Sequence, residues 1–403
     1  MSRPIAVGDS VLVTLGKQSG SFRIMVIDPA KSEIQVTSGD GSNKSLIKYN
    51  GSLWSVVGLN FPHTISFKSQ CRMSFFVSDK TTLKYDVDRL LPKVGLEFDC
   101  ILTAMPEWDN ANIIWKPVPK GLNWKELPNL RFFNNLITTP ETLTRKSSLL
   151  NIGLQVYGNE FFNYHPYTEL LSFRKIPTYS GTYPGLGTTA WITKPAASFG
   201  GEGIKLFWSP TELQKYLSIE KRPHVIQKYV ERPLLYQGKK FDLRIFIFLT
   251  LDTIQIHEFM YARVAPDQYQ MGSTDLRSNI TNISLHEEFD MAVSLAGVGI
   301  EKEEVMTFVR QLKPLFQKAQ EIERQYQIRE GIKFHTFDFL GLDIIFDENR
   351  KAWLLEINKE PGFNSSRGGI YTETPRVLED TLKEAIFFRL FPQQRIPTGF
   401  IVL

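Results

Sequence analysis

The sequence predicts a large α/β core preceded by a small β-barrel. From about residue 144 to the end, apolar runs of strand length alternate with segments of helical period, which is typical of an α/β fold. Between residues 7 and 60, short β-rich runs are separated by turn clusters. The 403 residues are 42% hydrophobic and 22% charged, so the chain is long enough for two or three globular domains.

The barrel is predicted from the first sixty residues. Turn clusters such as Asp28-Pro29 and residues 38–41 interrupt the apolar runs at short intervals. An SH3-like or OB-like barrel fits this spacing best. Such barrels are either recognition modules or structural appendages, and the sequence leaves both roles open. The predicted strands are residues 10–15, 22–27, 33–37, 45–49 and 53–57.

Helix signals mark the remainder of the chain. Residues 138–141, Thr-Thr-Pro-Glu, carry helix-start chemistry before an amphipathic run through Leu150. At residues 209–212, Ser-Pro-Thr-Glu predicts a second start with an N-cap serine, an early proline and a capping box. Residues 301–329 have a helical period, and their apolar stripe predicts core packing. The stripe comprises Val305, Phe308, Val309, Leu312, Leu315, Phe316, Ala319 and Ile322.

We therefore expect a barrel over residues 1–62, a mixed α/β subdomain over 63–137 and an α/β core over 138–403.

The composition of the chain limits the classes of function that the protein can have. A net charge of +4 permits an acidic partner but falls short of a nucleic-acid binder. Two unrelated cysteines, Cys71 and Cys100, exclude a disulfide framework and a CxxC metal site. No signal peptide and no run of roughly 20 apolar residues occurs, so we expect a soluble intracellular protein without membrane contact.

The segment 341–358 predicts a β-hairpin, because two apolar runs flank a polar turn centred between Asn349 and Arg350. If the turn is symmetric, Asp343 lies directly opposite Glu356, with Cβ atoms roughly 5 Å apart. Two carboxylates in that relation repel each other. They are compatible when a cation lies between them.

Asn358 lies on the same face as Glu356, because side chains along a strand repeat every two residues. Three oxygen-donating side chains without His or Cys suit Mg²⁺. The hairpin thus predicts a metal site formed by Asp343, Glu356 and Asn358. The alternative is a hairpin with a solvated acidic face, but the apolar residues around Glu356 indicate that both faces are largely buried.

Residues 191–207 predict two strands joined by a loop of small residues. Gly200, Gly201 and Gly203 allow backbone N–H groups to approach phosphate oxygens, and Lys194 at the strand end can reach the same charge. Neither a Walker loop nor a dinucleotide-binding glycine motif is present. A plain hairpin loop is therefore the alternative interpretation.

A charged strand face follows at residues 239–249. Lys240, Asp242 and Arg244 share one face of this strand, and its other face is apolar. Such a face lines either a cleft or a solvated edge. Arg263, in the strand-like run that follows, offers a second guanidinium that could bind a carboxylate bidentately, which favours the cleft.

Taken together and in order, these segments resemble the tubulin-tyrosine ligase and ligase-like family, which uses an ATP-grasp fold, over roughly residues 100–390. The resemblance implies ATP and Mg²⁺ as cofactors. It implies a nucleotide site made of Lys146, Lys194, Gly201, Gly203, Gln227, Lys228, Tyr229, Lys240, Asp242, Thr281 and Asn282. In this site the lysines at 146 and 194 would contact phosphates, and residues 227–229 would meet adenine. Arg244 and Arg263 match the substrate arginines, and Asp343, Glu356 and Asn358 match the magnesium ligands.

Two positions depart from the family pattern. Members usually carry Arg or Lys at the position of Gly200, and His-Leu-Thr-Asn where this chain has Asn-Ile-Thr-Asn at 279–282. Those side chains help hold phosphate and substrate in the family, so the two departures bear on activity more than on nucleotide binding. The lysines, arginines and metal ligands match the family, which argues against an inactive protein.

The implied activity is ATP-dependent ligation of a protein carboxylate to a free amino acid through an acyl phosphate. The loop at 201–204 and the hinge resemble the tyrosine ligase itself, so tyrosine is the favoured amino acid and tubulin the favoured acidic acceptor. Alternatives are ligation of glutamate or glycine, and a nucleotide-binding scaffold in which the barrel recognises a partner. The resemblance implies a cytoplasmic location and is compatible with association with the cytoskeleton. Nothing in the sequence indicates an oligomeric state.

Overall fold

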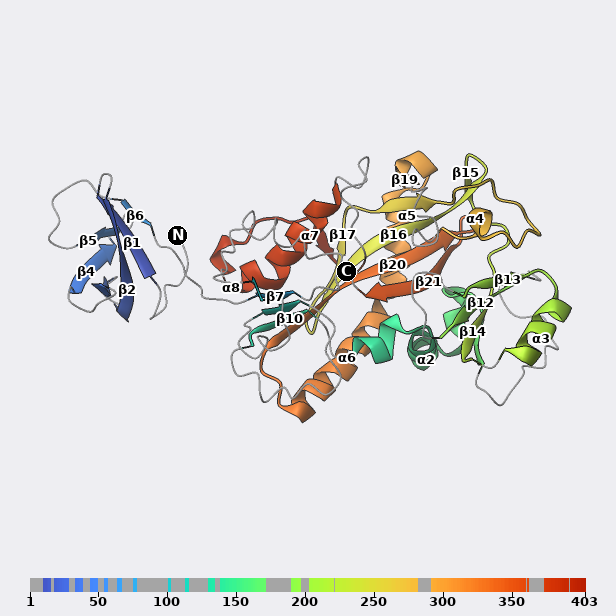
Figure 1. The fold of residues 1–403 in the computed structure, drawn as a ribbon, viewed down its shortest axis with the longest axis horizontal. Coiled ribbons are helices and arrows are strands. Elements are labelled where there is room, and N and C mark those ends of the chain that lie inside the picture. The colour runs from blue at the N-terminus through green and yellow to red at the C-terminus, as the bar shows by residue number, and fades with distance from the viewer. Residues whose placement is uncertain are drawn as a thin grey trace. The chain divides into compact units, whose positions relative to one another are not determined.

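The structure is a computed structural model in which two compact units are described (Figure 1). The described residues are the strands before residue 116, then 130–134, 138–171, 190–196, 203–220, 222–281, 291–359, 361, 373–390 and 392–403. The first unit comprises Met1–Trp115, Lys125–Leu130 and Leu382–Pro397. The second comprises Lys116–Trp124, Arg131–Thr381 and Thr398–Leu403. Helices and sheets together form the mixed α/β fold that the sequence predicts.

The first unit contains an antiparallel sheet with strand order β5-β4-β3-β2-β1-β6. Every predicted N-terminal strand coincides with an observed one, whereas β6 was not predicted. Closure of the sheet into a barrel stays a prediction. The strands are β1 (Ser10–Leu15), β2 (Gln18–Asp28), β3 (Glu33–Ser38), β4 (Lys44–Tyr49), β5 (Trp54–Val56) and β6 (Thr64–Ser66).

Three further strands and several short helical turns complete the described part of the first unit. Strand β7 (Phe75–Val77) pairs in parallel with β8 (Ile101–Leu102) and with β9 (Ile113–Trp115). The helical turns are η10 (Lys383–Phe387), α8 (Phe388–Leu390) and η11 (Pro392–Gln394).

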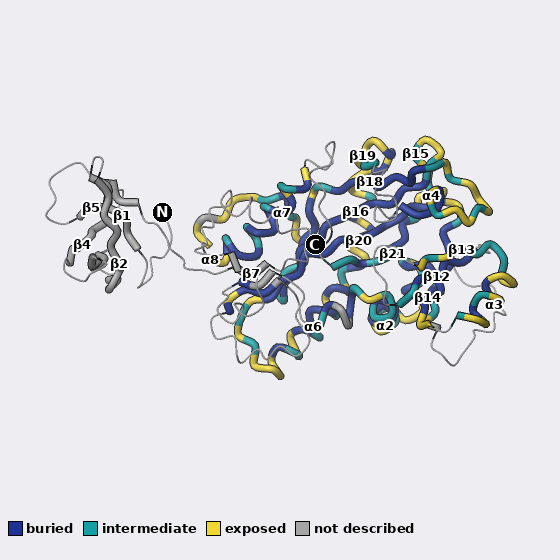
Figure 2. Tube along the Cα trace, in the orientation of Figure 1, coloured by how far each residue is buried: buried dark blue, intermediate teal, exposed yellow. Residues whose placement is uncertain are grey.

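Two long antiparallel strands, β16 (Lys239–Thr250) and β20 (His335–Phe346), form the centre of the second unit. Both are rich in Phe, Ile and Leu and are buried along almost their whole length, as Figure 2 shows in dark blue. Strand β16 is flanked by β18 (Tyr261–Val264), β17 (Ile254–His257) and β15 (Leu235–Tyr236). Strand β20 is flanked by β10 (Phe132–Asn134) and β21 (Ala352–Lys359). At the edges, β19 (Met291–Ser294) pairs with β18 and β22 (Phe400–Val402) pairs with β17.

The two faces of β16 and β20 have different partners. Leu243, Ile245, Leu342 and Ile344 belong to one core cluster with apolar residues of α2 (Lys146–Tyr157), α5 (Lys302–Gln311) and α6 (Lys313–Glu330). Each fully buried side chain of this kind contributes roughly 1.5–3 kcal/mol of transfer free energy. The opposite face carries the charged residues, because side chains alternate along a strand. The sheet thus separates an apolar core from a polar site.

A four-stranded antiparallel sheet is the other large element of the second unit. Its order is β11-β14-β12-β13. Leu213 and Leu217 of α3 (Pro210–Ile219) pack against Trp191 and Ile226 of this sheet. The strands are β11 (Thr168–Leu171), β14 (His224–Lys228), β12 (Trp191–Pro195) and β13 (Lys205–Phe207). The remaining helices are η5 (Gly158–Asn163), α4 (Leu276–Asn279), η7 (Ala296–Val298) and α7 (Thr374–Leu382).

Three helix predictions need correction in detail. The helix expected from residue 138 is a π-helical turn, η4 (Pro140–Thr144), separated from α2 by the extended residue Arg145. The 301–329 helix is divided into α5 and α6, which is consistent with Pro314 in the first turn of α6. Its apolar stripe is in the core as predicted, with Ile322 partly buried. Helix α3 starts after Ser209, but the predicted capping-box hydrogen bond from its side chain does not form.

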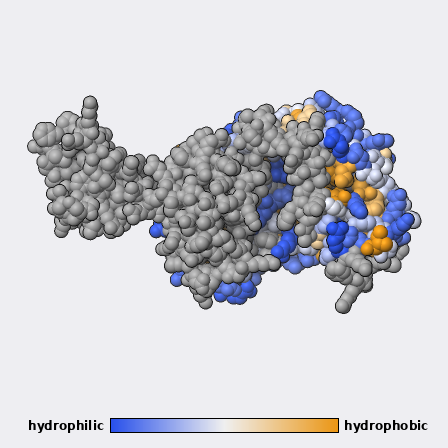
Figure 3. All heavy atoms as spheres, in the orientation of Figure 1, coloured by the Kyte–Doolittle hydropathy of each residue, from blue (hydrophilic) through white to orange (hydrophobic). Residues whose placement is uncertain are grey.

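Figure 3 shows that the described surface of the viewed face carries mainly hydrophilic residues, with apolar ones in small groups. Within the ranges that the structure describes, no helix has the length and apolar character that crossing a bilayer requires.

Candidate active site

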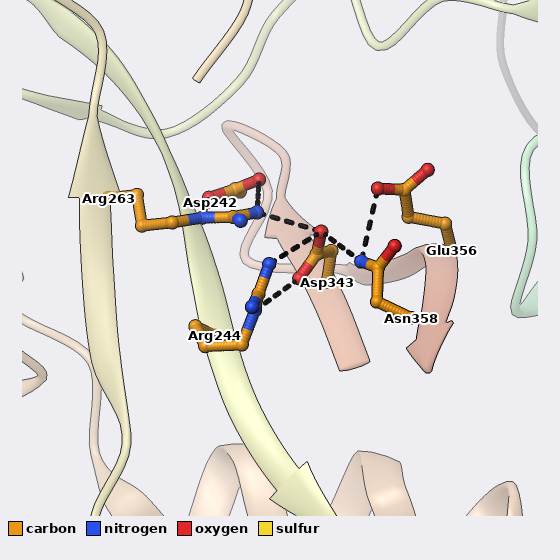
Figure 4. Close-up of polar contacts among 6 residues, drawn as sticks. All are labelled: Asp242, Arg244, Arg263, Asp343, Glu356 and Asn358. Atoms are coloured by element: carbon orange, nitrogen blue, oxygen red, sulfur yellow. Dashed lines mark hydrogen bonds and ion pairs between the residues drawn. The ribbon is translucent and has the colours of Figure 1, made fainter. Parts of the chain in front are cut away.

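The hairpin formed by β20 and β21 brings the predicted metal ligands together. Asp343 pairs directly with Glu356, and Gly341 pairs with Asn358. The Asn358 side chain donates from Nδ2 to Asp343 Oδ2 at 2.8 Å and to Glu356 Oε1 at 3.1 Å (Figure 4). The two carboxylates and the amide therefore lie on one face, as the sequence predicts.

The register arises differently from the prediction. Ile344 pairs with Leu354 whereas Asp343 pairs with Glu356, so Leu355 is an extra residue in a β-bulge. The turn is consequently centred on Asn349, half a residue earlier than expected. Asp347 holds this turn by accepting hydrogen bonds from the backbone N–H groups of residues 349 and 351.

Two arginines surround the buried Asp343. In register, Arg244 of β16 lies opposite Asp343, and Asp242 lies opposite Arg263 of β18. Arg244 Nε donates to Asp343 Oδ1 at 2.8 Å. Arg263 contacts Asp242 through Nε at 2.8 Å and through Nη2 at 2.5 Å, and its Nη2 also lies 2.8 Å from Asp343 Oδ2. These contacts, shown in Figure 4, make a charged ladder across β18, β16, β20 and β21.

The two arginines of the ladder favour the ionised form of Asp343. Burial raises the pKa of Asp343, but Arg244 and Arg263 outweigh this effect and lower the pKa to about 2. Burial lowers the pKa of Arg263, whereas the carboxylates of Asp242 and Asp343 raise it well above its usual value. Asp343 is therefore anionic at neutral pH, which is the state that a cation ligand requires.

The residues present fit a magnesium ion. Within the described ranges, no group of three His, Cys, Asp or Glu side chains could hold a metal. Asp343, Glu356 and Asn358 supply two carboxylates and one amide, the donor type that Mg²⁺ prefers. The Asn358 amide nitrogen already bridges both carboxylates as a hydrogen-bond donor. Rotation of this amide would present its oxygen instead.

Lys194 approaches the same carboxylates from β12. Its Nζ donates to Gln227 Oε1 at 2.9 Å. Burial lowers the pKa of Lys194 to about 8, an effect that Glu356 opposes and Lys146 reinforces. Asp343 opposes the shift as well, so the two predicted phosphate lysines and the two predicted carboxylate ligands lie in one electrostatic neighbourhood.

Lys240 lies on the charged face of β16 and contacts the predicted hinge. Its Nζ donates to the Tyr229 hydroxyl at 2.6 Å, which in turn donates to Asn279 Oδ1 at 2.9 Å. Burial lowers the pKa of Lys240 to about 7, with Asp242 opposing the shift. The Asn279 side chain also donates to the carbonyls of residues 273 and 275. Its hydrogen bonds thus tie α4 to the hinge.

The other predicted nucleotide residues are only partly described. Lys228 pairs in register with Trp191, and its Nζ lies 4.2 Å from the centre of the indole ring. Thr281 is buried. Gly203 has φ +75°, and a Cβ there would lie 2.7 Å from Pro195, so glycine is required. Residues 200, 201 and 282, all glycine or asparagine, lie outside the described residues.

One site residue was missed by the sequence reasoning. His165 is fully enclosed, and its Nε2 lies 3.0 Å from Gln227 Nε2, the amide whose oxygen accepts from Lys194. The sequence offers no signal for it, because a single histidine before a proline carries no characteristic spacing. Only the pairing of β14 with β11 and β12 brings it to Lys194.

The chain is similar to known proteins over most of its length after residue 134. A family model described as "Tubulin-tyrosine ligase family" matches residues 135–395. The probable tubulin polyglutamylase ttll-9 of Caenorhabditis elegans is 30% identical over 232 residues, which is 50% of this chain and 51% of that protein. The protein polyglycylase TTLL10 of Rattus norvegicus is 29% identical over 49% of this chain and 35% of its own length. The tubulin glycylase 3B of Tetrahymena thermophila is 28% identical over 50% and 18% respectively. The chain thus spans about half or less of these relatives.

Proposed function

Because the chain belongs to the tubulin-tyrosine ligase family, we propose that it is an ATP-dependent ligase that joins a protein carboxylate to the amine of an amino acid. The observation that carries this proposal is the cluster of Lys146, Lys194, Asp343 and Glu356. Cations for phosphates and oxygen ligands for Mg²⁺ at one place are what phosphoryl transfer needs. We assign this cluster to an ATP-grasp core over residues 138–403, preceded by subdomains 1–62 and 63–137.

The reaction proceeds in two steps. The acceptor carboxylate attacks the terminal phosphorus of ATP, which forms an acyl phosphate, and ADP leaves. The amine of the amino acid then attacks the acyl phosphate, forms an amide bond, loses a proton and releases phosphate. Asp343, Glu356 and Asn358 would hold Mg²⁺, which would neutralise charge on the phosphates.

The chain's own side chains position the reactants. Lys146 and Lys194 would spread phosphate charge, and Lys240 with Asp242 would contact the nucleotide. Gly201, Gly203, Gln227, Lys228, Tyr229, Thr281 and Asn282 complete the proposed nucleotide set. Arg244 and Arg263 would orient substrate carboxylates. Because both guanidiniums already contact Asp343, substrate and metal ligands would share one charge network.

For the amino acid, we favour glutamate or glycine. The resemblance of the loop and hinge predicted tyrosine, but the relatives given above are named polyglutamylase and glycylase. Tyrosine specificity has no support among them. An acidic protein, with tubulin as the leading candidate, fits the net charge of +4 and the names of two relatives, and it implies a cytoplasmic, cytoskeletal site of action.

Isotope-labelled amino acids test this function. The purified protein is incubated with ATP, Mg²⁺, tubulin and an equimolar mixture of labelled glutamate, glycine and tyrosine, and tubulin peptides are analysed by mass spectrometry. We expect ADP release that depends on tubulin, and label from glutamate or glycine. Label from tyrosine alone would favour the tyrosine specificity that the sequence predicts. If no labelled amino acid is attached to tubulin or to any other acidic acceptor, ligation is contradicted.

A nucleotide-binding scaffold is the second candidate, and Asn279 favours it. The family usually has His at this position, whereas Asn279 is buried and uses its amide for hydrogen bonds within the chain. Under this alternative, the protein binds ATP with Mg²⁺ but releases no ADP with any acceptor. The same assay therefore separates the two candidates.

A further inference from the structure

The segment Tyr164-His165 forms hydrogen bonds to the strand that carries Glu356. Leu354 of β21 donates from its backbone N–H to the Tyr164 carbonyl at 2.7 Å. The Leu354 carbonyl lies 2.7 Å from His165 Nδ1. The backbone N–H of His165 donates to Phe161, and Pro166 has no N–H. Because the Leu354 carbonyl can only accept a hydrogen bond, the imidazole is the donor in this contact. His165 must therefore carry its proton on Nδ1.

The second ring nitrogen sets the orientation of a glutamine. With Nδ1 protonated, neutral His165 presents Nε2 as an acceptor, 3.0 Å from Gln227 Nε2. Thr168 Oγ1, also 3.0 Å from Gln227 Nε2, donates its own proton to the Pro166 carbonyl and must likewise accept. Both neighbours thus require the NH₂ group of Gln227. The amide oxygen is left facing Lys194 Nζ at 2.9 Å.

We propose that His165 is a positioning residue that fixes the polarity of the Gln227 amide and so provides Lys194 with a hydrogen-bond acceptor. The same ring ties the four-stranded sheet to β21, two residues before Glu356. This inference rests on the proposed function for the role of Lys194 as a phosphate contact. It adds a residue that the predicted nucleotide and metal sets do not contain.

Two further observations support the assignment. Burial lowers the pKa of His165 to about 3, so the ring stays neutral at physiological pH. The ring also stacks on Phe161, with centroids 5.0 Å apart and an interplanar angle of 18°, which fixes its plane. If the Gln227 amide were reversed, its NH₂ group would face the Lys194 ammonium, and two donors would meet without an acceptor.

Three substitutions separate the two ring nitrogens. In His165→Gln, the amide oxygen can take the place of Nε2 and accept from Gln227. In His165→Asn, the shorter side chain can reach only the position of Nδ1, and His165→Phe keeps the stacked ring but no nitrogen. Binding of a fluorescent ATP analogue with Mg²⁺ is measured for each. We expect the Kd of the Gln variant to lie within about threefold of wild type. In the other two variants the Gln227 amide is no longer held with its oxygen toward the Lys194 ammonium, and loss of this hydrogen bond to a charged group should raise Kd about tenfold.

The matched control is His224→Gln. Like His165, His224 is buried, and it lies on β14 with Gln227, but its ring contacts the Arg222 carbonyl and the Tyr216 hydroxyl instead of Gln227. Its Kd should equal that of wild type. Equal loss of affinity in the Gln, Asn and Phe variants at 165, or no loss in any, would overturn the inference while leaving the proposed function in place. Absence of ATP binding by wild type would overturn both.

Nuclear magnetic resonance tests the tautomer in the wild-type protein without nucleotide, and the Gln variant serves only to assign the signal. In protein labelled with ¹⁵N-histidine, long-range ¹H–¹⁵N spectra distinguish a protonated Nδ1 from a protonated Nε2. The His165 signal, identified by its loss in the Gln variant, should show Nδ1–H and should not titrate between about pH 6 and 8. A protonated Nε2 would contradict the inference directly.

Discussion

Replacing Glu356 by Gln removes one negative charge beside Asp343 and keeps the side-chain volume. The Gln oxygen can still accept from Asn358 Nδ2, so the hairpin should remain folded. We expect ATP turnover in the presence of Mg²⁺ and acceptor to fall by about two to three orders of magnitude, because the proposed Mg²⁺ site loses a carboxylate ligand and with it the neutralisation of phosphate charge. ADP release and circular dichroism measure the two effects.

The control is Glu348→Gln in the turn of the same hairpin. Glu348 is half-exposed and pairs with the exposed Arg232 at 3.2 Å, far from Asp343 in the register. Its turnover should match wild type. Wild-type turnover in the Glu356 variant as well would show that the hairpin does not hold the metal.

Lys240 predicts how stability depends on pH. Its pKa is about 7 in the folded protein and 10.5 as the ordinary value, so between these values the unfolded chain binds more protons than the native one. Stability should therefore rise with pH from about 7 to about 10. Below about pH 7 the cost of burying the charged Lys240 is fully present and no longer changes with pH. In Lys240→Met, the slope of unfolding free energy against pH should decrease by on the order of 1 kcal/mol per pH unit.

Urea unfolding between pH 7 and 9.5 measures this slope. Lys239→Met is the matched control, since the neighbouring Lys239 is only half-buried and donates to the Pro266 carbonyl. Its slope should follow wild type. An unchanged slope in the Lys240 variant would show that this lysine is not buried as described.

At the scale of elements, Gly203 determines how β13 begins next to β12. The backbone at Gly203 has φ +75°, and an added Cβ would meet the Pro195 ring at 2.7 Å. Gly203→Ala should therefore strain the hairpin and displace Pro195, the residue after Lys194. We expect a loss of about 1–3 kcal/mol in stability and weaker ATP binding.

Gly272→Ala separates conformational strain from the contact. Gly272 has φ +87°, but an added Cβ meets nothing within 4 Å. This variant should lose about 1 kcal/mol in stability and keep wild-type ATP affinity. Equal ATP affinity in both variants would show that Pro195 and Lys194 do not depend on the glycine.

Periodicity predicted the elements well where one face is apolar and the other polar. The alternation along 239–249 placed Lys240, Asp242 and Arg244 on one face, and the structure has them there. The hairpin at 341–358 was also predicted, because its turn residues and apolar runs are local. Such patterns depend only on the neighbours of each residue along the chain.

Non-local register was beyond the sequence. That Arg244 lies opposite Asp343, 99 positions away, depends on how β16 and β20 align, and one residue of slip would change every partner. The contact of His165 with Gln227 is non-local in the same way. The extra residue Leu355 lies within the local hairpin and was nevertheless not predicted. The charged groups were recognisable as site residues, whereas their pairing was not.

For the whole molecule, the first unit and the family match define a truncation experiment. The match begins at residue 135, and β6 at Thr64–Ser66 pairs with β1, so removal of the N-terminal sheet must extend through Ser66. The shortened protein should bind ATP with an affinity within about twofold of the full chain, because its proposed nucleotide residues all follow residue 145. Capture of an acidic acceptor should weaken.

Fluorescent ATP binding and co-sedimentation with polymerised tubulin measure these two properties. A chain without residues 1–66 that stays folded by circular dichroism and yet binds no nucleotide would show that the N-terminal sheet is part of the core. Unchanged acceptor capture would instead make the sheet a structural appendage.

The charged ladder also constrains how this protein can evolve. Removing one partner of a buried ion pair leaves an uncompensated charge and costs about 3–5 kcal/mol, a large part of the stability of a typical domain. Positions 242 and 263, and likewise 244 and 343, should therefore be inherited together: in descendants of this gene, a substitution that removes one charge of a pair should be accompanied by one that removes the other. The stability of the ladder should therefore preserve these residues even in a lineage that no longer needs the chemistry of the site.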